Sequence, residues 1–202
     1  MGSFESLGLR KFGNRGEKIV NVQLPKTVYA TFVGPLDQTT LPRLFQNFDG
    51  AVTGQVEDVH LLFQSAGGMI SDGISLYNFF KSLPLAVHLY NTGSVQSVAV
   101  IAYLGGDQRY VSRHANFMIH KSHFPAPERS NAAKLEALAS TLIAEDARVE
   151  EILRENTTIP DEKWSQHALH DVYLTAQEAV EFGIANEIRE FDIPPGCQIF
   201  NI

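Results

Sequence analysis

The sequence predicts a single α/β domain built from repeated strand–helix units around a mainly parallel sheet. Its 202 residues suit one domain with a sizeable core, and no internal repeat divides them. Short apolar runs with strand character alternate along the chain with amphipathic segments that begin at capping residues. Because parallel strands need crossover connections, this alternation indicates helices on the faces of the sheet. Functional residues of such sheets gather at the carboxyl ends of the strands.

Three strand–helix steps fill the first half of the chain. Each strand is a short apolar or alternating run, followed by a turn or capping residue and then by a helical pattern. The predicted strands are residues 27–33, 59–63 and 86–91, and the helices that follow open at Thr39, Ser71 and Ser97. Ser65-Ala66-Gly67-Gly68 stops the second strand, so this loop and Ser97 both fall at strand ends.

The longest predicted helix lies in the second half of the chain, from about residue 131 to about residue 156. Its apolar residues recur at three- and four-residue steps, which is typical of a helix with one buried face. Glu145 and Asp146 interrupt that face, so we expect it to be divided between packing within the chain and contact with another subunit. The remaining predicted elements are strands at 109–111, 116–119 and 184–188 and short helices after Pro160 and Thr175.

Composition and charge exclude several classes of function. A formal net charge of −7 argues against nucleic acid as the main partner, because phosphate binding needs clustered Lys and Arg. The single cysteine, Cys197, cannot form an internal disulfide and has no Cys or His near it in sequence. We therefore expect a reducing compartment and no structural metal. No leader pattern and no run of membrane-spanning length is present, which predicts a cytoplasmic protein without membrane association.

The two ends of the sequence are expected to lie outside the folded domain. Residues 1–18 mix glycines with scattered charges and keep no period, which predicts a mobile N-terminal segment. Residues 191–202 contain Pro194-Pro195-Gly196 and are predicted to form a C-terminal tail. The folded domain is therefore expected over residues 19–190.

Ser97, His120 and Asp171 form a candidate constellation for acyl transfer. A serine at a helix start meets unpaired N–H groups, which favour the negative charge of an attacked carbonyl. His120, at the exit of a predicted buried strand, would take the proton of Ser97, and Asp171 would fix the imidazole tautomer. The backbone N–H groups of Gly68 and Val98 would bind the oxyanion.

Each of these residues also has a purely structural interpretation. Ser97 fits a helix N-cap, and His120 fits a hydrogen-bonded histidine at a strand end. Asp171 fits a turn or capping residue, and Gly67-Gly68 fits a simple strand–helix turn. The segment around Ser97 also lacks the second glycine of the Gly-x-Ser-x-Gly elbow. From local pattern alone, both interpretations stay open for every one of these residues.

The order of motifs from Val28 to Glu190 resembles that of ClpP, the proteolytic subunit family of the Clp protease. Ser65-Ala66-Gly67-Gly68 resembles the family's Ser-Pro-Gly-Gly loop, with Ala66 in place of the proline. The segment Gly93-Ser94-Val95-Gln96-Ser97-Val98-Ala99 is similar to its Gly-Gln-Ala-Ala-Ser-Met-Gly nucleophile segment. Met118-Ile119-His120-Lys121 is similar to Met-Ile-His-Gln, and the segment starting at Asp171 to Asp-Arg-Phe-Met-Ser-Ala-Glu-Glu-Ala.

This resemblance implies a divergent ClpP-like serine endopeptidase with a single-domain ClpP/crotonase-like fold. It implies Ser97, His120 and Asp171 as the catalytic triad, and the Gly68 and Val98 amides as the oxyanion hole. Residues 131–156 would form the handle helix of a heptameric ring, which can stack as a tetradecamer. The substrates would be peptides or unfolded proteins, delivered by an ATP-dependent unfoldase. The subunit itself would use no cofactor and no metal.

Two other functions fit the same fold class. One is a catalytically silent ClpP-like subunit with a structural or regulatory role in a mixed ring. The other is a crotonase-type acyl-CoA enzyme, which has a two-amide oxyanion hole but no such triad. The presence of Ser97 and His120 favours the peptidase, whereas stable binding of coenzyme A thioesters would favour the second alternative.

Overall fold

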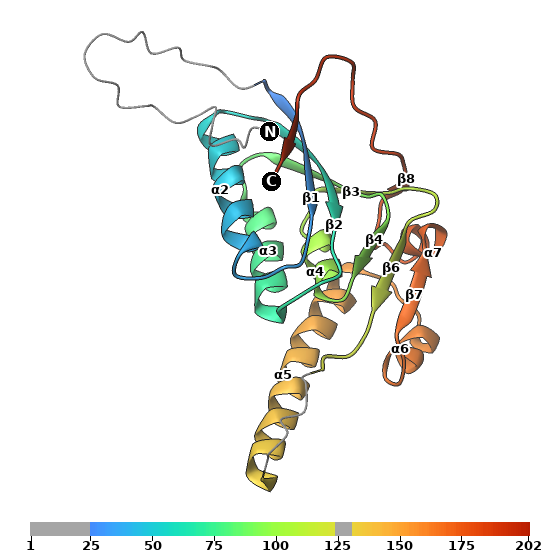
Figure 1. The fold of residues 1–202 in the computed structure, drawn as a ribbon. Coiled ribbons are helices and arrows are strands. Elements are labelled where there is room, and N and C mark those ends of the chain that lie inside the picture. The colour runs from blue at the N-terminus through green and yellow to red at the C-terminus, as the bar shows by residue number, and fades with distance from the viewer. Residues whose placement is uncertain (1–24, 124–130) are drawn as a thin grey trace, which may run out of the picture.

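A six-stranded, wholly parallel sheet organises the molecule (Figure 1). The computed structural model describes residues 25–123 and 131–202, so the predicted mobile segment 1–18 lies outside the described residues. The sheet has the strand order β8-β5-β3-β2-β1-β9, and every neighbouring pair is parallel. Its strands are β1 (Thr27–Val33), β2 (Asp58–Gln64), β3 (Ala86–Asn91), β5 (Gln108–Val111), β8 (Glu187–Ile188) and β9 (Ile199–Asn201). The predicted α/β class with a mainly parallel sheet is confirmed.

A second sheet of three strands lies beside the carboxyl ends of β2 and β3. It consists of β4 (Ser94–Gln96), β6 (Asn116–Ile119) and β7 (Val172–Thr175). β4 and β6 are parallel, whereas β6 and β7 are antiparallel. An isolated bridge between Ser65 and Val95 connects this sheet to the loop that follows β2. The small sheet therefore gathers three segments that are far apart in sequence.

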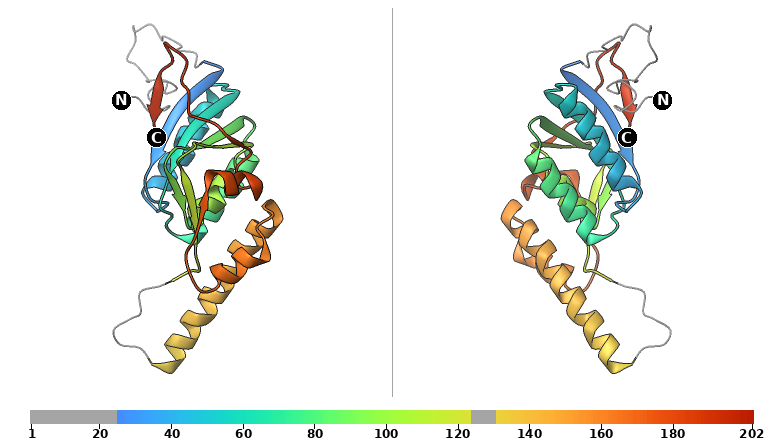
Figure 2. Two further views of the ribbon diagram at one scale, coloured as in Figure 1. Left: turned by 90° about the vertical axis from the view of Figure 1, so that its right-hand side faces the viewer. Right: turned by 90° about the vertical axis from the view of Figure 1, so that its left-hand side faces the viewer.

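Six helices surround the two sheets in the described part of the chain. They are α2 (Thr40–Thr53), α3 (Ile70–Ser82), α4 (Val98–Leu104), α5 (Ala132–Asn156), α6 (Asp161–His167) and α7 (Ala176–Glu181). Figures 1 and 2 show α2 and α3 together against the large sheet, and α5 extending far beyond the body of the molecule. All seven residues of α4 are buried, so this helix forms the centre of the core. Of α5, only Leu153 is buried.

Close packing between α3 and α4 depends on Gly73. A Cβ added at Gly73 would lie 2.3 Å from Cγ2 of Val98, far inside contact distance. The two helices can therefore approach only because Gly73 has no side chain. This contact fixes the start of α4, and with it the turn that precedes Val98.

Three short strands are absent from the sequence prediction. β4 and β9 have three residues each, which is too short for a periodic signal, and two of the four residues of β7 are exposed. β9 lies within the predicted tail 191–202, where Ile202 is buried and its N–H donates to the carbonyl of Thr31 at 3.0 Å. The end of the chain thus adds an edge strand to the large sheet.

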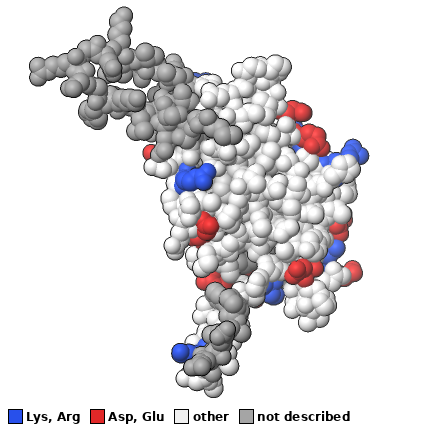
Figure 3. Space-filling model, in the orientation of Figure 1, with Lys and Arg blue, Asp and Glu red and all other residues white. Residues whose placement is uncertain are grey.

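Charged side chains are spread over the surface. On the face drawn in Figure 3, Lys and Arg lie singly among uncharged residues and do not form a patch. In residues 25–123 and 131–202, no helix combines the length and apolar character needed to cross a lipid bilayer.

Candidate active site

Ser97 occupies the turn between β4 and α4, and its backbone is left-handed. Its φ is 56° and its ψ is −136°, a conformation that non-glycine residues rarely adopt. Such a conformation costs about 1–3 kcal/mol and persists only where the surrounding structure holds it. Here the N–H of Ser97 donates to the carbonyl of Met118 in β6 at 2.7 Å. The small sheet therefore sustains the strained turn that presents the Ser97 hydroxyl.

His120 follows β6 directly, and its Nε2 lies 2.7 Å from Oγ of Ser97. The register pairs Gln96 of β4 with Met118 of β6, so the two side chains project from the ends of adjacent strands. Burial lowers the pKa of His120 below its ordinary value of 6.5, and the charge of Asp171 partly opposes this effect. A neutral imidazole in hydrogen-bond contact with a hydroxyl can accept its proton. The structure thus brings the predicted nucleophile and base together.

Asp171 stands opposite His120 without touching it. β6 and β7 are antiparallel and pair Ile119 with Val172, so the next pair along the ladder is His120 and Asp171. The Asp171 side chain is exposed, and among the described residues no hydrogen bond joins it to His120. Its influence is electrostatic, because its negative charge raises the pKa of the imidazole. The third predicted residue is therefore adjacent to the pair but not hydrogen-bonded to it.

The loop after β2 approaches Ser97 so closely that it requires glycine. Gly67 has a φ of 97°, and a Cβ there would lie 2.7 Å from Cβ of Ser97. A Cβ at Gly68 would lie 1.9 Å from the carbonyl oxygen of Leu36. Neither position can carry a side chain without displacing backbone or Ser97.

The backbone N–H groups of Gly68 and Val98 lie outside the regular hydrogen-bond ladders. The N–H of Leu36 donates to the carbonyl of Gly67 at 2.8 Å, and that of Met69 to the carbonyl of Leu36 at 3.1 Å. These two bonds form a parallel bridge in which the N–H of Gly68 takes no part. Val98 is the first residue of α4, so its N–H precedes the helical ladder. Both groups are available to bind a developing oxyanion.

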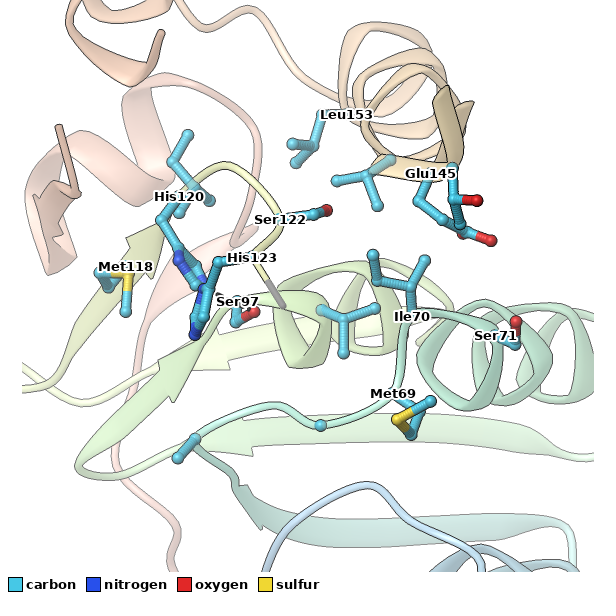
Figure 4. Close-up of a pocket in the computed structure, with 16 residues that line it drawn as sticks. Met69, Ile70, Ser71, Ser97, Met118, His120, Ser122, His123, Glu145 and Leu153 are labelled. Atoms are coloured by element: carbon cyan, nitrogen blue, oxygen red, sulfur yellow. Dashed lines mark hydrogen bonds between the residues drawn. The ribbon is translucent and has the colours of Figure 1, made fainter. Parts of the chain in front are cut away.

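A cavity of 520 Å³ opens beside the Ser97–His120 pair (Figure 4). Its walls come from the loop after β2, the start of α3, the start of α4, the end of β6 and one face of α5. The apolar side chains among them are Ala66, Met69, Ile70, Val98, Met118, Ile119, Val149 and Leu153. Such a cavity can hold one side chain of a substrate whose carbonyl lies at Ser97.

The segment after His120 is held against α5 by two carboxylates. The N–H of Ser122 donates to Oδ1 of Asp146 at 2.8 Å. Nζ of Lys121 lies 3.3 Å from Oε2 of Glu150 and 3.9 Å from Oδ2 of Asp146. Asp146, which interrupts the apolar face of the helix, therefore anchors the segment that follows β6 to the wall of the cavity.

The sequence patterns do not predict a role in this site for two of the residues that line it. His123 lines the cavity, and its ring centroid lies 5.2 Å from that of His120. Glu145 lines the same cavity from α5. A signal existed for Glu145, because Thr141, Glu145, Val149 and Leu153 recur at four-residue steps and so share one helix face. No local pattern distinguishes His123.

The described residues offer no evident metal site. Within the ranges 25–123 and 131–202, no group of three or more His, Cys, Asp or Glu side chains could hold a metal ion.

Comparisons with known proteins show which family and which fold this chain resembles. The family model described as Clp protease matches residues 34–192. ATP-dependent Clp protease proteolytic subunit 3 from Rhizobium etli is 25% identical over 157 residues, which cover 77% of this chain and 80% of that protein. A solved structure of a ClpP1 point mutant from Listeria monocytogenes superposes with a TM-score of 0.68 at 24% identity, covering 82% of this chain and 92% of that one. The superposition confirms the predicted ClpP/crotonase-like fold.

Proposed function

The chain belongs to the Clp protease family, and from this we propose that it is a serine endopeptidase acting on peptides or unfolded proteins. One observation carries the proposal: Ser97 Oγ and His120 Nε2 are 2.7 Å apart at the mouth of an apolar cavity. Gly68 and Val98, whose amides would bind the oxyanion, line the same cavity. A helix cap alone would require neither the imidazole contact nor the cavity.

In the proposed mechanism, Ser97 Oγ attacks the carbonyl carbon of the scissile bond while His120 Nε2 takes the hydroxyl proton. The N–H groups of Gly68 and Val98 donate to the oxyanion of the tetrahedral intermediate. His120 then gives its proton to the leaving amine, and an acyl-enzyme remains on Ser97. A water molecule, activated by the same imidazole, hydrolyses the acyl-enzyme. Asp171 stabilises the imidazolium through its negative charge across the β6–β7 ladder.

The test is covalent labelling of Ser97. We expect a fluorophosphonate probe to modify the wild-type protein at one residue, located at Ser97 by mass spectrometry of the digested protein. Ser97→Ala should remain folded by circular dichroism and take no label. Absence of labelling and of peptide cleavage in the wild-type protein would contradict the proposal and favour a catalytically silent subunit. Stable binding of a coenzyme A thioester would favour the crotonase-type alternative.

The pH dependence of turnover provides an independent check on His120. The proposed base is the neutral imidazole of His120, and burial lowers its pKa below 6.5. Because activity is lost as the imidazole takes up a proton, kcat/KM should fall to half its maximum only below pH 6.5. His123 also lowers the pKa of His120, whereas Asp171 raises it. His123→Gln should therefore move the midpoint upward, and Asp171→Asn should move it downward. Profiles of kcat/KM from about pH 5 to about pH 9 measure all three shifts, and a wild-type midpoint above 6.5 would contradict the assignment.

We further propose that the active form is a homo-oligomer, a heptameric ring able to stack as a tetradecamer and to receive substrates from an ATP-dependent unfoldase. The support is the surface of α5, where Leu135 is 50% exposed and Ile143 is 70% exposed. Large apolar side chains in such positions are typical of contacts between subunits. The mass of the protein in solution, measured on the sample used for labelling, determines the number of subunits.

A further inference from the structure

Glu145 is the only carboxylate among the described residues that line the cavity beside Ser97. It belongs to the face of α5 formed by Thr141, Glu145, Val149 and Leu153 at four-residue steps. Eight residues of helix separate Glu145 from Leu153, which corresponds to about 12 Å along the axis. In the view of Figure 4, Glu145 and Ser97 are drawn on different sides of the group of lining side chains. The described lining therefore combines several apolar side chains with a single carboxylate.

The carboxylate of Glu145 has capacity for a further partner. Nη1 of Arg148 contacts Oε1 at 3.1 Å and Oε2 at 2.9 Å, so one nitrogen serves both oxygens. The Arg148 side chain is 47% exposed, whereas that of Glu145 is 23% exposed. An ion pair with a solvent-exposed partner contributes little, and a carboxylate can accept about four hydrogen bonds. A second cation that enters through the cavity would find open acceptor positions on Glu145.

We propose that this cavity selects substrates with lysine or arginine on the acyl side of the scissile bond. The inference rests on the proposed peptidase function and names its substrate class. The long methylene stem of such a side chain would pack against Ile70 and Val98, while its charged end reaches Glu145. An apolar side chain of equal length would shield the carboxylate from water and add no partner beyond Arg148, which is unfavourable for a charge. An acidic side chain would be repelled.

A series of fluorogenic peptides that differ only in the acyl-side residue tests this selection. Lysine and norleucine have the same four-carbon stem, and only lysine carries a charge. We expect kcat/KM for the lysine peptide to exceed that for the norleucine peptide by about 10- to 100-fold. A glutamate peptide should be the poorest of the three.

Substitutions on α5 assign the selection to one side chain. Glu145→Gln should reduce the lysine-to-norleucine ratio to about 1, and Glu145→Lys should reverse the preference toward the glutamate peptide. Glu151→Gln is the matched control, because it removes the same charge from an exposed position of the same helix. It should retain the wild-type ratio.

The outcomes separate this inference from the function on which it rests. Equal kcat/KM for lysine and norleucine in the wild-type protein, or an unchanged ratio in Glu145→Gln, overturns the selection and leaves the peptidase assignment intact. Failure to cleave any peptide of the series, together with failure to label Ser97, overturns both.

Discussion

Replacement of His120 by glutamine is expected to lower kcat/KM for peptide cleavage by about 10⁴-fold. Glutamine can still hydrogen-bond to the Ser97 hydroxyl, but it cannot accept the proton, so the nucleophile stays weak. The N–H groups of Gly68 and Val98 remain in place and sustain a residual rate. Steady-state kinetics with one fluorogenic peptide measures the loss, and circular dichroism checks that the variant is folded. A loss of less than about 10-fold would exclude His120 as the base.

Asp171→Asn is the informative comparison for this variant. Asp171 is exposed and has no hydrogen bond to His120 among the described residues, so its contribution should be mainly electrostatic. We expect its loss to lower kcat/KM by about 10- to 100-fold, well short of the effect at His120. Equal losses in the two variants would instead mean that substrate binding completes an Asp171–His120 hydrogen bond.

Gly68→Ala should lower kcat by about 10²–10³-fold, the usual effect of losing one oxyanion donor. The added Cβ would lie 1.9 Å from the carbonyl oxygen of Leu36, and this neighbour is backbone and cannot rotate away. The bridge between Leu36 and Gly68 must therefore open, which moves the Gly68 N–H away from Ser97. Turnover by the purified variant measures the effect.

The matched control for this loop is Gly34→Ala. Gly34 lies in the neighbouring turn after β1, and a Cβ there would find its nearest atoms at 3.8 Å, an ordinary contact distance. We expect nearly wild-type kcat and thermal stability for this variant. Comparable loss of activity in both variants would mean that any added side chain in these two neighbouring segments disturbs the site, and would remove the argument for an oxyanion donor at Gly68.

Local chemistry decided which parts of the fold could be predicted. The helix at Thr175 was predicted from its capping residues, and the structure has a full capping box between Thr175 and Glu178. Strand β3 was predicted with its bounds, because its apolar run is flanked by clear turn signals. β4 could not be predicted, since three residues form a strand only when β6 lies beside them.

The residues of the candidate site differ in the same way: the sequence was enough to predict some of them and not others. Ser97, His120 and the Gly67-Gly68 loop fall at strand ends, so chain order was enough to make them candidates. The position of Asp171 relative to His120 depends on the pairing of β6 with β7, which joins segments far apart in the sequence. The role of Glu145 depends on which elements face α5 across the cavity. Those contacts are set by tertiary packing. The sequence shows that Glu145 interrupts an apolar helix face, but it does not show what this carboxylate faces.

The small sheet has a mechanical consequence for the proposed enzyme. The N–H of Ser97 donates to the carbonyl of Met118 in β6, and the N–H of Gln96 donates to the carbonyl of Ser65 in the loop that carries the proposed oxyanion donor Gly68. Nucleophile, base and oxyanion loop are thus joined by backbone hydrogen bonds, and their thermal motions should be correlated. The α5 wall of the cavity is joined to this framework through side chains, including the ion pair of Lys121 with Glu150. The proposed catalytic groups are thus held by backbone hydrogen bonds, and the proposed selecting wall is held to them by side chains, so we expect substitutions in the wall to change the choice of substrate while the reaction geometry persists.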